Sequence, residues 1–70
     1  MILETYYLSN NIDKVIELTE LSIDELEYIV GKFKSTHYRF PNLLKGELVI
    51  YPDYMIIRHH FTKKVLWTNK

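Results

Sequence analysis

The stretch ELVIYPDYMIIRHHFTKKVLWT, residues 47–68, decides the fold, because it holds three runs of β-branched and aromatic residues separated by two turns. Such runs favour strands. The predicted strands are Glu47–Tyr51, Tyr54–Phe61 and Val65–Thr68. Pro52 has a fixed φ that favours a tight turn after the first strand, and Thr62–Lys64 form the second turn. Strands joined by turns this short pair antiparallel, so residues 47–68 predict an antiparallel sheet.

The predicted helix lies upstream of these strands. Ser22-x-x-Glu25 is a capping box, in which each residue's side chain accepts a hydrogen bond from the other's backbone N–H. An apolar stripe at helical spacing follows it, at Ile23, Leu26, Ile29, Val30 and Phe33. Gly31 indicates either a close packing contact or the end of the helix.

The sequence leaves the secondary structure of residues 12–21 ambiguous but not that of Ile2–Leu8. Ile2–Leu8 predict a strand, and Asn10-Asn11 suit a turn after it. Ile12–Leu21 fit a helix, but they also fit a strand paired with the first, and the strand is slightly favoured. The overall prediction is one α+β domain over residues 1–70 in the order ββαβββ, with an antiparallel sheet of four or five strands and one main helix.

Composition indicates a small globular protein. Apolar residues make up 47% of the 70 residues and charged residues 26%. The absence of cysteine excludes disulfides and thiolate metal sites and agrees with a reducing, cytoplasmic setting. The longest apolar runs, Leu48–Tyr51 and Tyr54–Ile57, are far shorter than a membrane span, so no membrane association is expected.

Charge is divided between the two halves of the chain, although the net charge is zero. Residues 1–30 hold seven acidic and one basic residue, and residues 31–70 hold two acidic and eight basic residues. The chain is also rich in residues with AT-rich codons and lacks Ala, which is typical of low-GC bacteria, their phages and their plasmids. A phage or mobile-element accessory protein is therefore one interpretation.

No motif indicates catalysis, a metal or a cofactor. His59 and His60 are adjacent on a predicted strand, so their side chains should point to opposite faces and not share one ion. Ser22 is explained by capping, and two isolated glycines cannot build a phosphate-binding loop. We expect a protein that is not an enzyme, with no catalytic residues, metal or cofactor.

Protein binding is the predicted function, because one helix can cover only one face of the sheet. The expected partner-binding residues are of types enriched at interfaces: Tyr38, Arg39 and Phe40 in the loop, and Tyr54 and Arg58 on the sheet. The partner would be a protein that this chain inhibits or regulates, and the acidic half would mimic nucleic acid or pair with the basic half of a second copy as a homodimer. The alternative is nucleic-acid binding by the basic half.

Overall fold

The strands of the C-terminal half pair in the order of the chain, and the N-terminal strand joins them at one edge. The computed structural model describes residues 1–31 and 45–70. In this part of the chain the strands are β1 (Glu4–Tyr7), β2 (Gly46–Ile50), β3 (Met55–His59) and β4 (Val65–Thr68). They form one antiparallel sheet in the order β1-β2-β3-β4. The predicted α+β class with an antiparallel sheet of four or five strands is therefore confirmed, and the described sheet has four.

Between β1 and residue 31 the structure describes two helices, α1 (Ile12–Thr19) and α2 (Ile23–Val30). The strand slightly favoured for residues 12–21 is wrong, and the described elements follow in the order βααβββ rather than ββαβββ. A strand would place Glu17 on the same face as Val15 and Thr19. A helix instead buries Val15 and Thr19 together, four residues apart, and leaves Glu17 exposed. β1 consequently pairs with β2 and not with residues 12–21.

α1 ends at a residue in the left-handed conformation. Glu20 has a φ of 62°, and its backbone N–H donates to the Ile16 carbonyl over 2.8 Å. The Thr19 hydroxyl donates to the Val15 carbonyl and accepts from the Leu21 backbone N–H. These bonds satisfy groups that a helix end leaves unpaired and turn the chain directly into α2.

α2 begins at the predicted capping box. The Glu25 backbone N–H donates to Ser22 Oγ over 3.1 Å, and the Ser22 backbone N–H donates to Glu25 Oε1 over 2.9 Å. Gly31 follows the last helical residue, and its N–H donates to the Glu27 carbonyl, so Gly31 does mark the end of the helix. Phe33, which was predicted to continue the apolar stripe, lies outside the described residues.

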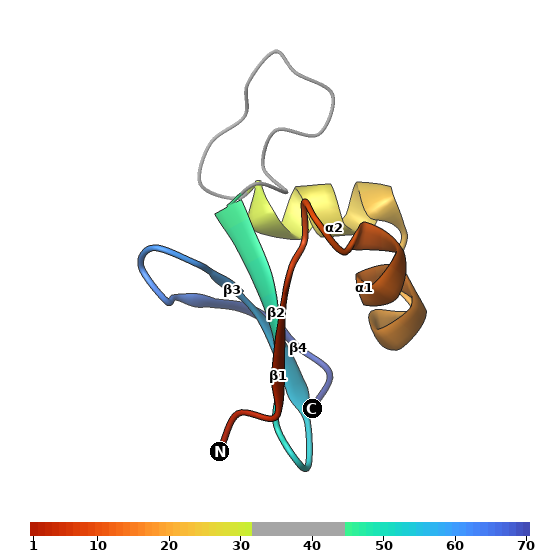
Figure 1. Cartoon of the computed structure of the whole chain (residues 1–70). Coiled ribbons are helices and arrows are strands. Elements are labelled where there is room, and N and C mark those ends of the chain that lie inside the picture. The colour runs from red at the N-terminus through yellow and green to blue at the C-terminus, as the bar shows by residue number, and fades with distance from the viewer. Residues whose placement is uncertain (32–44) are drawn as a thin grey trace.

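Both helices lie on the same side of the sheet (Figure 1). They bury one apolar core between helices and sheet, which consists of Leu8, Val15, Leu26, Val30, Leu48 and Ile57. Leu48 and Ile57 face each other across β2 and β3, so the helix-facing side of the sheet contributes the centre of this core. A Cβ on Gly46 would lie 2.6 Å from Leu8 Cδ1 and 2.9 Å from Val30 Cγ2, so glycine is what lets α2 and β1 close over the start of β2.

We expect Gly46→Ala to destabilise the fold by about 1–3 kcal/mol, because the added methyl overpacks the core. Urea unfolding followed by circular dichroism measures the change. The Gly46→Ala/Leu8→Val double variant lacks the clashing Leu8 Cδ1. We therefore expect the double variant to lose less unfolding free energy than the two single variants lose in total. Strict additivity would contradict this account.

The capping box makes the stability of the fold vary with pH in the acidic range. Hydrogen bonds from the Ser22 backbone N–H, and secondarily the Ser22 side chain, lower the pKa of Glu25 below its ordinary value of 4.5. The charged carboxylate therefore stabilises the folded state above that pH, and its contribution is lost as the pH falls through the lowered pKa. We expect the wild type to exceed Glu25→Gln in melting temperature at pH 7 and the difference to shrink toward pH 3. A constant difference between pH 7 and pH 3 would refute this role.

Candidate functional site

The sheet face that points away from the helices is the first candidate surface, and we call it the outer face. Its side chains, from the strand register, are Thr5, Tyr7, Glu47, Val49, Ile56, Arg58, Val65 and Thr68. Neither α1 nor α2 lies on it (Figure 1). Its centre is nevertheless closed, since Val49 is 0% and Ile56 7% exposed. A partner that binds this face would therefore contact the side chains around Val49 and Ile56 rather than these two residues.

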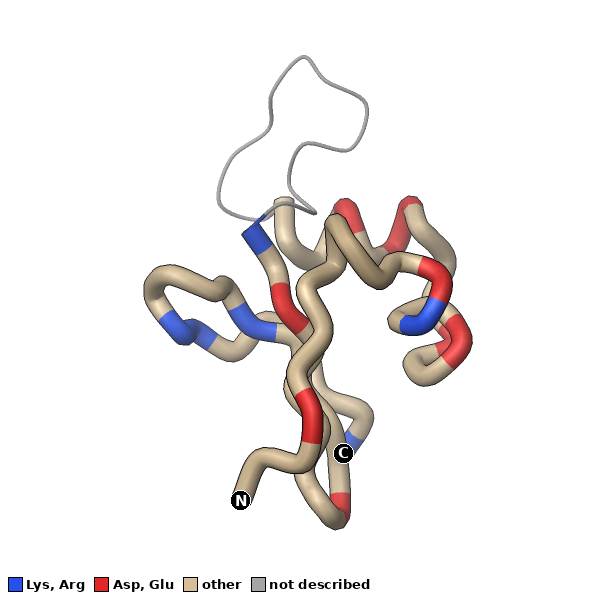
Figure 2. Tube along the Cα trace, in the orientation of Figure 1, with Lys and Arg blue, Asp and Glu red and all other residues tan. Residues whose placement is uncertain are grey.

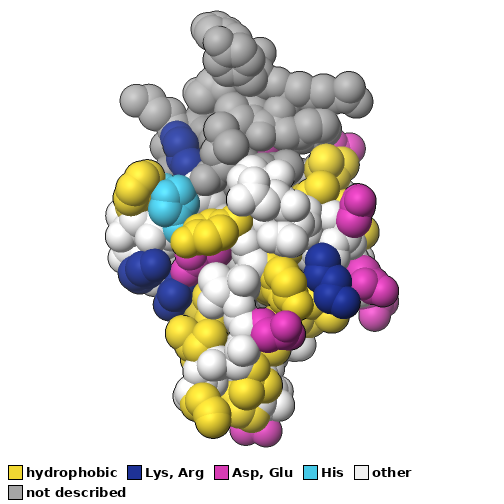
Figure 3. All heavy atoms as spheres, viewed as in Figure 1, with side chains coloured by type: hydrophobic (Ala, Val, Ile, Leu, Met, Phe, Trp, Pro, Cys, Tyr) yellow, Lys and Arg dark blue, Asp and Glu magenta, His cyan; other side chains and the backbone are white. Residues whose placement is uncertain are grey.

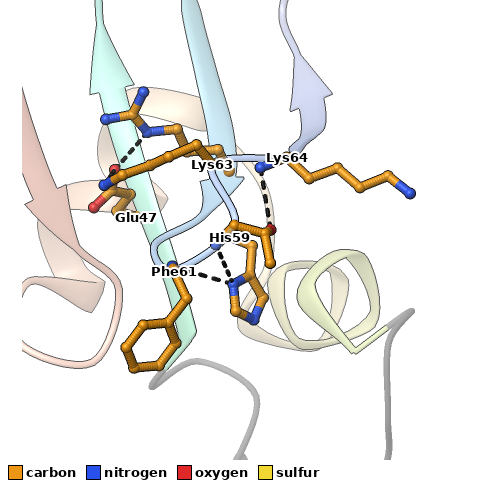
Figure 4. Close-up of polar contacts among 7 residues, drawn as sticks. Glu47, His59, Phe61, Lys63 and Lys64 are labelled. Atoms are coloured by element: carbon orange, nitrogen blue, oxygen red, sulfur yellow. Dashed lines mark hydrogen bonds and ion pairs between the residues drawn. The ribbon is translucent and has the colours of Figure 1, made fainter.

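A buried carboxylate lies within the outer face. Glu47 is 2% exposed, and its Oε2 accepts from Arg58 Nε over 2.5 Å and lies 3.5 Å from Lys63 Nζ (Figure 4). Arg58 is the cross-strand neighbour of Glu47, whereas Lys63 reaches over from the turn between β3 and β4. Two cations thus compensate one buried anion, which would otherwise be costly to remove from water. The predicted site residue Arg58 is held in place by this pair.

The turn between β3 and β4 is fixed by hydrogen bonds to His59. His59 Nδ1 accepts from the backbone N–H groups of Phe61 and Thr62 over 3.2 and 3.4 Å (Figure 4). The Lys63 N–H donates to the His59 carbonyl over 2.8 Å, and Lys63 has a left-handed φ of 63°. The His59 side chain and its carbonyl thus accept the backbone N–H groups that shape this turn.

An aromatic row lies on this turn and the adjoining edge of the outer face, formed by Tyr7, His60 and Phe61. The Tyr7 and His60 rings meet edge to face with centroids 6.2 Å apart, and the His60 and Phe61 centroids are 4.0 Å apart. Phe61 is 77% and Tyr7 50% exposed. In Figure 3, hydrophobic side chains lie beside a histidine with Lys or Arg side chains next to them. The row thus combines exposed rings with nearby cations.

The sequence placed His60 and Phe61 differently. The strand predicted for Tyr54–Phe61 is too long: alternation along it would put Phe61 on the face of Ile57, and it led us to expect His59 and His60 on opposite faces. β3 ends at His59, so His60 and Phe61 belong to the turn and alternation does not apply to them. The His59 and His60 rings are instead stacked with centroids 5.8 Å apart. The sequence predicted a turn at Thr62–Lys64, but no residue in that stretch indicated that the turn begins two residues earlier, at His60.

Two of the five predicted partner-binding residues, Tyr54 and Arg58, belong to the described part of the chain, and they do not lie together. Tyr54 lies in the turn between β2 and β3, where its ring stacks on Tyr51 at 4.8 Å, and Arg58 lies near the other end of β3. Tyr38, Arg39 and Phe40 lie outside the described residues. The involvement of all five in binding stays a prediction.

Charge is separated in space as well as in sequence (Figure 2). The helices and the residues between them carry six acidic residues and one basic residue, Lys14, within residues 12–30. Arg58, Lys63 and Lys64 lie on the β3–β4 hairpin, away from the helices (Figure 2). The outer face and its hairpin are thus the basic side of the molecule, and the helical layer is the acidic side.

Residues 1–31 and 45–70 hold no group of three or more His, Asp or Glu side chains arranged to bind a metal ion. Within the same ranges, neither helix is long and apolar enough to span a bilayer.

No protein-family model, curated protein or solved structure matches this chain.

We expect Glu47→Gln to destabilise the fold by about 1–3 kcal/mol, because it leaves the largely buried Arg58 without its anion, whereas Lys63 is 55% exposed and stays solvated. Glu17→Gln removes an exposed carboxylate 3.6 Å from Lys14 and should cost no more than about 0.5 kcal/mol. Denaturant unfolding of both variants measures the contrast. Equal effects would show that Glu47 behaves as a surface charge.

Proposed function

We propose that this chain is a small, non-enzymatic protein-binding module of the cytoplasm whose docking surface is the aromatic row with its basic neighbours. The observation that supports this most directly is the exposure of Phe61 on a turn fixed by hydrogen bonds to His59. A large ring held in water by a rigid turn contributes nothing to the core, but it loses little conformational freedom on binding. Aromatic and arginine side chains are also the types enriched at interface hot spots.

The proposed partner surface is apolar with acidic groups around it. Phe61 and Tyr7 supply the apolar contact, and Lys63, which is 55% exposed, lies beside them on the same turn. Such a surface would favour carboxylates opposite Lys63, which speeds association and fixes the orientation of the partner. An accessory factor of a phage or mobile element that inhibits or regulates a host protein is one role that fits this chemistry.

Nucleic-acid binding is the second candidate, since Lys63 and Lys64 are adjacent on the turn that bears Phe61. Basic side chains follow phosphates, and aromatic rings stack on bases. Arg58 and Lys63 already share the Glu47 carboxylate, which reduces the positive charge they offer to phosphates. A partner held mainly by apolar contact with Phe61 and Tyr7 depends less on that charge than a polyanion does, which favours the protein partner.

Affinity capture with matched variants tests the proposal. Phe61 and Leu3 are both exposed apolar side chains, 77% and 53%, but Leu3 lies ahead of β1 and belongs to neither proposed site. We expect the wild type and Leu3→Ala to retain the same protein from a nuclease-treated lysate. Phe61→Ala should bind it about tenfold or more weakly while keeping the wild-type melting temperature, as for a hot-spot ring.

Two results would contradict the proposal. One is undiminished capture by Phe61→Ala. The other is capture that nuclease abolishes, with affinity that falls steeply as salt rises, which would indicate nucleic-acid binding.

A further inference from the structure

A groove lies between α2 and β4, on the helix-facing side of the sheet. Its volume is about 380 Å³, and it is lined by Leu21, Asp24, Glu25, Tyr28, Ile29 and Trp67. Trp67 is the cross-strand neighbour of the core residue Ile57, so its ring extends the core toward the edge of the sheet. This groove is separate from the outer face, because Trp67 points to the opposite side of the sheet.

The groove has aromatic walls and an acidic rim. The half-buried ring of Trp67 and the largely exposed ring of Tyr28 line it from the sheet and the helix. Asp24 and Glu25 lie in the first turn of α2, and Glu25 Oε1 is held by the Ser22 backbone N–H. Aromatic rings beside carboxylates form a suitable environment for a cation on an apolar stem, because ring faces and carboxylates both attract positive charge.

The surrounding charge selects a basic occupant. None of the lining residues is Lys or Arg, and residues 12–30 around the groove carry a net charge of −5, from six acidic residues and one basic residue. A second copy of the chain, related by a two-fold axis through this groove, would bring Asp24 and Glu25 against their own counterparts. Like charges brought together in this way oppose association. The groove is therefore better suited to a basic partner than to a copy of itself.

The neighbouring strand is open for pairing. β4 is an edge strand that pairs with β3, and in the part of the chain that the structure describes no strand pairs with its other side. An edge strand presents a row of backbone N–H and C=O groups to which an extended peptide can add. Backbone pairing along β4 would place alternate side chains of such a peptide on the face where Trp67 lies.

We propose that the α2–β4 groove and the free edge of β4 bind an extended segment of a partner protein through a lysine or arginine side chain. The segment pairs with β4, the aliphatic stem of its basic residue packs on Trp67 and Tyr28, and its cation reaches Asp24 and Glu25. This site is independent of the aromatic row and opposite to it in charge.

Trp67 provides a direct assay, since it is the chain's one tryptophan. The probe is an acetylated and amidated heptapeptide with Lys at its centre and alternating Thr and Val on either side, compared with the same peptide carrying central Glu or norleucine. We expect the Lys peptide to change Trp67 emission saturably. The Glu peptide should need at least about tenfold higher concentration, and the Lys response should weaken severalfold as salt rises.

Variants tie the response to the groove. Asp24→Asn and Tyr28→Ala should each weaken binding of the Lys peptide about threefold, as expected for one charge or one exposed ring. Phe61→Ala should leave it unchanged, so failure here and failure of the aromatic-row proposal are distinguishable. Melting temperatures confirm that each variant is folded.

Three outcomes would overturn the inference. Trp67 emission that stays constant up to millimolar Lys peptide excludes binding, and an equal response to the Glu peptide excludes charge selection. Emission that depends on protein concentration without peptide would assign the groove to a second copy of the chain.

Discussion

The structure depends on the neutralisation of one buried carboxylate. Glu47 lies in the second strand of the sheet, almost without contact to water, and an uncompensated charge there would cost several kcal/mol, on the order of a small domain's stability. Arg58 compensates it from the neighbouring strand, which requires the observed register of β2 and β3. Lys63 compensates it from the turn, which requires the turn to bend over the outer face. The ion cluster thus couples the pairing of the strands to the shape of the turn.

The shape of that turn determines what the outer face offers to a partner. Lys63 pairs with Glu47, and His59 Nδ1 accepts the N–H groups of Phe61 and Thr62. These contacts hold the turn in a conformation in which the Phe61 side chain lies outside the core. It is left exposed next to His60 and Tyr7. The interactions that stabilise the sheet and those that create the aromatic row are therefore the same interactions, and the row is built on a rigid support.

Sequence patterns predicted the features that depend on local geometry. The capping box and the antiparallel sheet each follow from a few adjacent residues and were predicted correctly, whereas Gly31 left two interpretations open, a close packing contact or the helix end that the structure shows. Residues 12–21 were not, because Val15 and Thr19 fit both periodicities and only packing against the sheet keeps Glu17 exposed. The ion cluster and the α2–β4 groove join residues that are far apart in the chain, and no spacing rule connects Glu47 to Lys63 or Tyr28 to Trp67. The expected interface stays a prediction, because Arg58 lies on the outer face whereas the exposed aromatic cluster consists of Tyr7, His60 and Phe61, none of which was expected to bind.

The division of charge along the chain becomes a division in space because the helices and the sheet form two layers. Both helices pack on one face of the sheet, so the acidic residues of α1 and α2 lie in one layer and the basic β3–β4 hairpin belongs to the other (Figure 2). Packed layers are about 10 Å apart, and the screening length at physiological salt is about 8 Å. Each side of the molecule is therefore largely shielded from the opposite charge on the other side, even though the net charge is zero. A basic segment in the groove and an acidic surface on the aromatic row would each meet a favourable local potential, so a chain of 70 residues has room for two partners of opposite charge.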